Sequence, residues 1–182
     1  MAYINVPEDL PGIRALMAFR PETARYINEL AEILLRGENS LSRGDRELIA
    51  TYVSYLNDCF FCQNAHGAIA QHYMNCDMHT LDRIKEDVEA GPVSDKMKAL
   101  LSIAGSVQKS GREVKLTQIH RAKKAGATDR EIHDTVLIAA FFSLCNRYVD
   151  GLGTTAPSDR EYYIKRGKMR AEEGYRDFDL YK

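Results

Sequence analysis

Two cysteines and a histidine lie in one predicted helical segment, and this arrangement constrains the chain more than any other feature. The segment is Ser42–His72, and it contains Cys59, Cys62 and, four residues further on, His66. Cysteines separated by two residues at a helix start lie one turn apart, where they can close a disulfide and where the helix lowers a thiol pKa. Because residues four apart share a helix face, the sequence predicts an imidazole within reach of the second sulfur.

A carboxylate on the preceding helix completes the predicted group. Glu47 stands twelve residues before Cys59 and can fold back toward the same pocket. Asn57 and Asp58 predict the end of one helix and the N-cap of the next, so that Cys59 opens the new helix. A thiol, a base, a second thiol and a carboxylate that orients the base together indicate a redox-active dithiol.

Apolar residues recur at helical spacing along most of the chain, and no alternation of period two persists long enough to indicate a strand. Capping boxes mark helix starts at Ser42, with Asp45, and at Thr128, with Glu131. The predicted helices cover approximately residues 21–36, 42–57, 59–75, 81–90, 94–109 and 116–125, and a mostly buried helix follows from 128 through the apolar run 136–144. The sequence therefore predicts an all-α fold.

The length predicts one domain. A chain of 182 residues is long enough for one well-filled core and short for two independent ones. We expect a single helical domain over 1–182, with its core at about 21–155. The charged segment 158–182 begins as a helix, which is either a solvated surface helix or an arm that packs on a neighbouring subunit.

A short internal similarity suggests a degenerate two-fold repeat. Arg46-Glu47-Leu48 and Arg130-Glu131-Ile132 each follow a capping residue and precede an apolar helix, 84 residues apart. Laid over each other, the two copies align Cys59, Cys62 and His66 with Ser143, Asn146 and Asp150. A chance match between two capped helix starts is the alternative.

Composition excludes some partners and indicates a compartment. A formal net charge of -1 favours neither nucleic acid nor an anionic membrane, and the longest apolar run, 135–145, is too short to span a bilayer. Because no secretory signal is visible in MAYINVPEDLPG, we expect a cytoplasmic protein, in which cysteines are free thiols, metal ligands or a cycling redox pair. Cys76 and Cys145 lack a spaced partner and are predicted to be buried as small apolar residues. None of the ten tyrosines is assigned a role.

The stretch RELIATYVSYLNDCFFCQNAH resembles the signature of the AhpD-like alkylhydroperoxidase and carboxymuconolactone decarboxylase superfamily, and most closely its uncharacterised peroxidase-related branch. The shared features are the Arg-Glu pair, the following Ser and Asn, and the CxxCxxxH motif. A weaker likeness extends to CNRYVDGLG in the second half. The resemblance implies an all-helical AhpD-like bundle and a homo-oligomer, which is a dimer, a trimer or a hexamer in such proteins.

The resemblance also implies a role for each residue of the motif. Cys62 would be the thiolate that attacks a hydroperoxide, His66 would take its proton, Glu47 would assist through a water, and Cys59 would be the resolving thiol. The pattern departs at Phe61, where the best-known members place a histidine, so the implied proton relay lacks that group. No cofactor is implied, and no GxGxxG follows a predicted strand. Electrons would therefore come from a dithiol protein or a small thiol.

Four alternatives stay open at the level of sequence. Position at the helix start favours Cys59 as the more exposed and more acidic thiol. His66, four residues after Cys62, instead favours Cys62 as the activated thiol. The two cysteines with His66 and Glu47 also have the composition of a four-ligand zinc site. The other branch of the superfamily suggests a cofactor-free decarboxylase or lactone-processing enzyme, whose acid–base chemistry needs no cysteine pair. The last alternative is a non-enzymatic helical protein that binds a metal or senses redox state.

Overall fold

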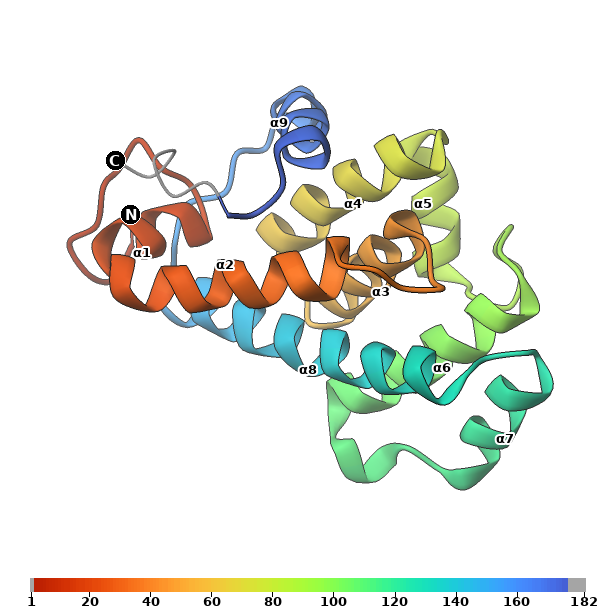
Figure 1. Cartoon of the computed structure of the whole chain (residues 1–182). Coiled ribbons are helices and arrows are strands. Elements are labelled where there is room, and N and C mark those ends of the chain that lie inside the picture. The colour runs from red at the N-terminus through yellow and green to blue at the C-terminus, as the bar shows by residue number, and fades with distance from the viewer. Residues whose placement is uncertain (1, 177–182) are drawn as a thin grey trace.

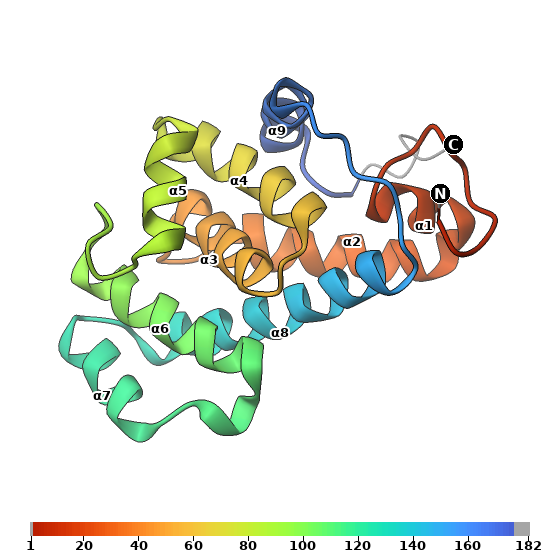
Figure 2. The ribbon, with the colours of Figure 1, turned by 180° about the vertical axis from the view of Figure 1, so that it is seen from behind.

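The computed structural model describes residues 2–176, and these residues form helices and connecting segments without a strand. The helices are α1 (Ile13–Phe19), α2 (Pro21–Arg36), α3 (Arg43–Leu56), α4 (Phe60–Met74), α5 (Met78–Glu86), α6 (Asp95–Lys109), a 3₁₀ turn η1 (Gly111–Glu113), α7 (Leu116–Lys124), α8 (Asp129–Gly151) and α9 (Arg160–Glu173). The predicted all-α fold is confirmed. Figures 1 and 2 show α9 on one side of the bundle and α7 on the opposite side.

Helix α3 is the centre of the bundle and contacts α2, α4, α5, α6 and α8. It begins with the predicted capping box, in which the Ser42 hydroxyl accepts from Asp45 N at 3.0 Å and Asp45 Oδ2 accepts from Ser42 N at 3.1 Å. Leu48, Ile49 and Val53 are fully buried in the main core. Burial of such a side chain contributes roughly 1.5–3 kcal/mol, so this packing holds α3, and with it Glu47, in one position.

The end of one helix differs clearly from the prediction. Helix α5 ends at Glu86 instead of Ala90, because the Asp87 carboxylate accepts from the backbone N–H groups of Glu89 and Ala90 and so forms a turn outside the helix. Such local side-chain bonds are not reported by hydrophobic periodicity. Helix α8 contains the apolar run and ends at Gly151.

The internal similarity is limited to two helix starts. Both α3 and α8 have capping boxes, and in both a threonine four residues after the aligned glutamate donates to that glutamate's carbonyl at 2.7 Å. The chain breaks between α3 and α4 at residues 57–59, whereas α8 runs unbroken through the aligned positions 141–143. The second half therefore has no counterpart of the turn that carries the cysteines.

Helix α9 packs on α4 of the same chain. Tyr163, Gly167 and Ala171 form its buried face, and a Cβ at Gly167 would lie 2.7 Å from the Cβ of Ala68. The segment predicted as a solvated helix or an intersubunit arm thus has one face against its own core. Residues 177–182 of that predicted segment lie outside the described residues.

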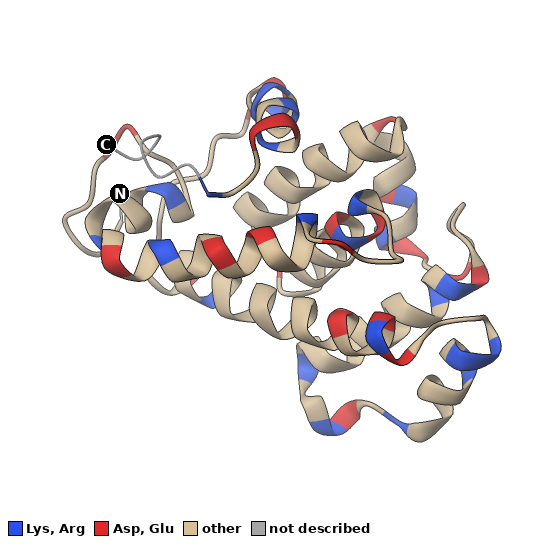
Figure 3. Ribbon diagram, viewed as in Figure 1, with Lys and Arg blue, Asp and Glu red and all other residues tan. Residues whose placement is uncertain are grey.

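The surface carries charges of both signs. Acidic and basic residues are mixed along α2 in the view of Figure 3, in keeping with the formal net charge of -1. Within residues 2–176, no helix combines the length and the apolar character needed to cross a membrane.

Candidate active site

A tight turn between α3 and α4 places the two cysteines. Asn57 ends α3, as predicted, but Asp58 adopts φ 56° and is not the N-cap. Cys59 is the N-cap instead, in an extended conformation, and its N–H donates to Ser54 O at 3.0 Å. Aspartate is one of the few residues that tolerate the left-handed conformation, so Asp58 permits this reversal of the chain.

The two thiols lie in different surroundings. Cys59 is fully buried and Cys62 is 3% exposed, so the more exposed Cys59 that its helix position predicted is wrong. Its interaction with Cys62, followed by burial, raises the pKa of the Cys59 thiol. Burial raises the pKa of the Asp150 carboxyl, and the nearby Cys59 partly offsets that rise. The raised pKa favours the protonated form of Cys59 beside Cys62.

His66 is held by Glu47, which approaches from α3. His66 Nδ1 and Glu47 Oε2 are 2.8 Å apart, and the Glu47 side chain is fully buried. An ionised carboxylate only accepts, so the proton in this bond belongs to Nδ1, which leaves the lone pair on Nε2 as the basic position of the ring. The predicted convergence of the two side chains is present, and their contact is direct, without the intervening water that the resemblance implied.

Tyr175, from the segment after α9, is a third member of this group that the sequence did not reveal. Its hydroxyl donates to Glu47 Oε1 at 2.6 Å and lies 3.4 Å from His66 Nδ1, and its ring stacks on the imidazole. Burial, and then the charge of Glu47, raise the pKa of this phenol. Glu32 accepts from the Tyr175 backbone N–H at 2.8 Å and fixes the segment. A tyrosine 128 residues from its partner leaves no motif in the sequence.

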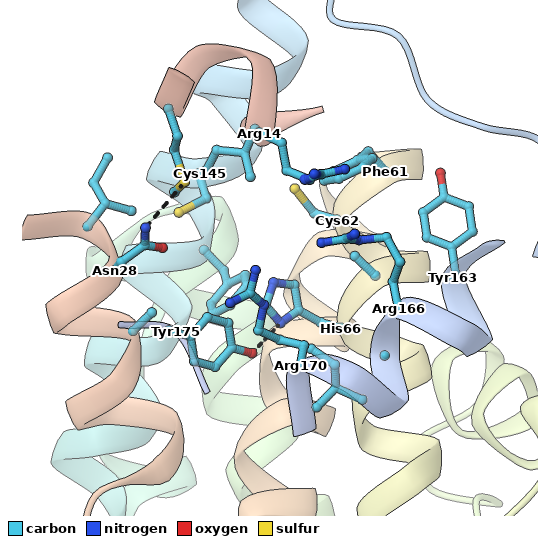
Figure 4. Close-up of a pocket in the computed structure, with 18 of the residues that line it drawn as sticks. Arg14, Asn28, Phe61, Cys62, His66, Cys145, Tyr163, Arg166, Arg170 and Tyr175 are labelled. Carbon is cyan, nitrogen blue, oxygen red and sulfur yellow. Dashed lines mark hydrogen bonds between the residues drawn. The ribbon is translucent and has the colours of Figure 1, made fainter. Parts of the chain in front are cut away.

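Cys62 and His66 face a common cavity of about 110 Å³ between α1, α2, α4, α8 and α9 (Figure 4). The volume admits several water molecules or a small hydroperoxide. Its walls are mainly apolar, with Phe61, Phe141 and Phe142 among them. Cys59 and Glu47 lie behind this lining. Of the predicted site residues, Cys62 and His66 thus face a ligand, whereas Cys59 and Glu47 lie beneath them.

The remaining two cysteines have no partner in this arrangement. Cys145 is buried, as predicted, but it also lines the cavity, and burial raises its pKa to about 12. Cys76, predicted to be buried, is only partly so. Neither is bonded to another cysteine.

The four-ligand metal site is not formed. Nowhere in residues 2–176 do three or more His, Cys, Asp or Glu side chains gather in an arrangement that could hold a metal ion. The Glu47 carboxylate is instead hydrogen-bonded to His66 and Tyr175.

Comparison with known proteins supports the resemblance stated from the sequence. Residues 21–73, which contain all four predicted site residues, match the model of the carboxymuconolactone decarboxylase family. An uncharacterised peroxidase-related protein from Silicibacter sp. TM1040 has the same fold, with a TM-score of 0.76 and 24% identity over 86% of this chain and 80% of that one.

A second solved structure is described as an alkylhydroperoxidase AhpD core, an uncharacterised peroxidase-related protein from Ralstonia eutropha JMP134. It matches with a TM-score of 0.79 and 24% identity over 92% of this chain and 96% of that one. No curated protein matches the chain. The AhpD-like resemblance is thus confirmed by the family model and by the shared fold.

Proposed function

We propose that the protein is a dithiol peroxidase that reduces hydroperoxides with Cys62 as the attacking thiolate. The observation that carries the proposal is that Cys62, but not Cys59, lines a cavity together with an imidazole held by a buried carboxylate. The names of the structural neighbours and the family match over residues 21–73 agree with this chemistry.

In the proposed first step, the Cys62 thiolate attacks the outer oxygen of a hydroperoxide. The O–O bond breaks, the sulfur is oxidised to a sulfenic acid, and the alkoxide leaves. Imidazole Nε2 of His66 first takes the thiol proton and then returns it to the alkoxide, which departs as an alcohol. Glu47 stabilises the imidazolium that exists between these two transfers, and Tyr175 holds the carboxylate in place.

In the second step, the Cys59 thiol condenses with the Cys62 sulfenic acid. The sulfur–sulfur bond forms as water leaves, with one proton from Cys59 and the hydroxyl from the sulfenic acid. The interaction of the two thiols that raises the pKa of Cys59 supports this pairing. A dithiol protein or a small thiol then supplies two electrons and two protons and restores both cysteines.

Phe61 shortens the proton relay that the family motif implies. Its ring lines the cavity and packs edge-on against Tyr163 at 6.0 Å, so no ionisable side chain stands between the cysteines. We therefore assign proton transfer to the leaving oxygen to His66.

The test separates the two cysteines. Cys62→Ser should abolish peroxide consumption, whereas Cys59→Ser should form a sulfenic acid that dimedone traps after one equivalent of peroxide. Cys145→Ser is the matched control, because it removes the other thiol that lines the same cavity and should retain turnover. Trapping in the Cys62→Ser protein alone would reverse the assignment of the two thiols.

Thiol counting with metal analysis separates the proposal from the other functions. Loss of two thiols after one equivalent of peroxide, without metal, supports the peroxidase. Unchanged thiols would favour the cofactor-free decarboxylase, and stoichiometric zinc would favour a metal-binding protein.

A further inference from the structure

An arginine from α1 lies at the cavity that holds Cys62. Arg14 is one of the lining residues, and Figure 4 shows its side chain directed toward Phe61 and the space beside the Cys62 sulfur. The dithiol mechanism proposed above assigns no role to this guanidinium group. In that mechanism, His66 alone acts on the oxygen that leaves.

The backbone that carries Arg14 is fixed against the start of α4. Gly12, two residues earlier, has φ 60°, and its N–H donates to Thr155 O at 2.8 Å. The ring of Phe61 packs so closely on Gly12 that a Cβ at this position has no room. Because Phe61 directly precedes Cys62 in the chain, this contact holds the start of α1 in one arrangement relative to the attacking thiol.

The Arg14 guanidinium has few partners of its own. Within residues 2–176, its one hydrogen bond runs from Nη1 to the Tyr162 hydroxyl, at the long distance of 3.5 Å. Its Nε is buried and has no acceptor in this part of the chain. Buried donors without an acceptor are costly and uncommon in folded proteins. A guanidinium in this state beside a reactive thiol indicates a group that meets its acceptor during the reaction.

The proposed chemistry creates such an acceptor at the thiol. When the Cys62 thiolate attacks the outer oxygen of a hydroperoxide, the electron pair of the O–O bond moves to the inner oxygen, which leaves as an alkoxide. This charge is absent from the bound substrate and develops only in the transition state. N–H donors that are already in place inside an apolar cavity stabilise a developing oxyanion strongly.

We propose that Arg14 is a catalytic residue that donates hydrogen bonds to the leaving oxygen of the hydroperoxide. This inference rests on the proposed peroxidase function and adds the group that stabilises its transition state. A guanidinium does not give up its proton in proteins, so Arg14 stabilises the alkoxide while His66 supplies the proton that makes it an alcohol. The sulfur is still oxidised to the sulfenic acid, and the reaction balances as described above.

The test compares two oxidants whose leaving groups differ in basicity. tert-Butyl hydroperoxide releases an alkoxide, whereas 3-chloroperbenzoic acid releases a carboxylate, which is a far weaker base and needs less stabilisation. In stopped-flow measurements of the first step, Arg14→Gln should slow the reaction of tert-butyl hydroperoxide roughly 100-fold and that of the peracid less than about fivefold. The peracid, measured on the same preparation, reports whether the variant is folded and has a reactive thiol.

Arg20→Gln is the matched control, because it removes a positive charge from an exposed position directly after α1. Both oxidants should react with this variant at the wild-type rate. An equal loss for the two oxidants in Arg14→Gln, or no loss for either, would overturn the role of Arg14 while leaving the peroxidase proposal in place. The same selective loss in Arg20→Gln would overturn it as well. A wild-type protein that consumes neither oxidant would refute the peroxidase proposal and this inference together.

Discussion

Replacement of Tyr175 by phenylalanine tests whether the buried hydroxyl positions the catalytic pair. The substitution keeps the ring, which is 7% exposed and stacks on His66, and removes only the hydroxyl that donates to Glu47 Oε1 at 2.6 Å. A hydrogen bond to a charged group contributes about 1.5–3 kcal/mol. Because Glu47 retains its bond to His66 at 2.8 Å, we expect a loss near the lower end, about 1.5–2 kcal/mol.

The same hydroxyl should matter for turnover. If the full contribution stabilises the imidazolium in the transition state, kcat/KM for a hydroperoxide should fall roughly 10- to 30-fold, at about 1.4 kcal/mol for each factor of ten. The assay is peroxide consumption by the reduced protein under stopped flow, with urea unfolding of the same preparation to measure the loss of stability. The rate of the first, peroxide-dependent step should decrease, because the hydroxyl acts through Glu47 on His66.

Tyr163→Phe is the matched control for this prediction. Tyr163 is also buried, also lines the cavity and also loses one bond, but its hydroxyl donates to the backbone carbonyl of Pro157 at 2.8 Å. It should lose stability of about 1 kcal/mol and keep the rate of the first step. An equal loss of rate in both variants, or full activity in a folded Tyr175→Phe protein, would refute the positioning role.

Two further predictions concern the packing of α9 and the alkaline limit of stability. Gly167→Ala should destabilise the fold by about 1–3 kcal/mol in urea unfolding, because the new Cβ would lie 2.8 Å from the backbone carbonyl carbon of Ala68 on α4. Gly111→Ala is the control, because nothing lies within 4 Å of a Cβ built at that position. Equal stability of the two variants would contradict this packing. Burial raises the pKa of the Cys145 thiol from 9.0 to about 12, so the neutral thiol should stabilise the fold fully below pH 9. That contribution is on the order of 4 kcal/mol. It should be lost as the pH rises from 9 to 12, because the unfolded chain releases the proton first. Unfolding free energies of the wild-type protein and Cys145→Ala across that range should therefore converge, and parallel curves would exclude the effect.

The local sequence predicted the helices and the cysteine pair well because the relevant interactions are short-range. The capping boxes at Ser42 and Thr128 join residues three apart, and both are present. Cys62 and His66 share one face of α4 because they are four residues apart, and both line the cavity. The approach of Glu47 to His66 could also be predicted from the sequence, because one turn connects the two helices that carry these residues.

The difference between the two cysteines could not be read from their positions in the helix. Position at the helix start favours Cys59 as the more exposed thiol, but Cys59 packs in a small core cluster with Val149 and Tyr163. These partners come from α8 and α9, about 90 to 100 residues away in the chain. Their effect on the thiols depends on tertiary packing.

The sequence by itself determined an all-helical fold, a dithiol next to an imidazole and the carboxylate that orients it, since each follows from helical periodicity and from spacings within one helix pair. Only the tertiary structure decided which thiol faces the cavity and that Tyr175 holds Glu47. The physical reason is that α1, α9 and the segment after α9 contact α4 through side-chain packing between residues distant in the chain. Such contacts leave no periodicity or motif in the sequence.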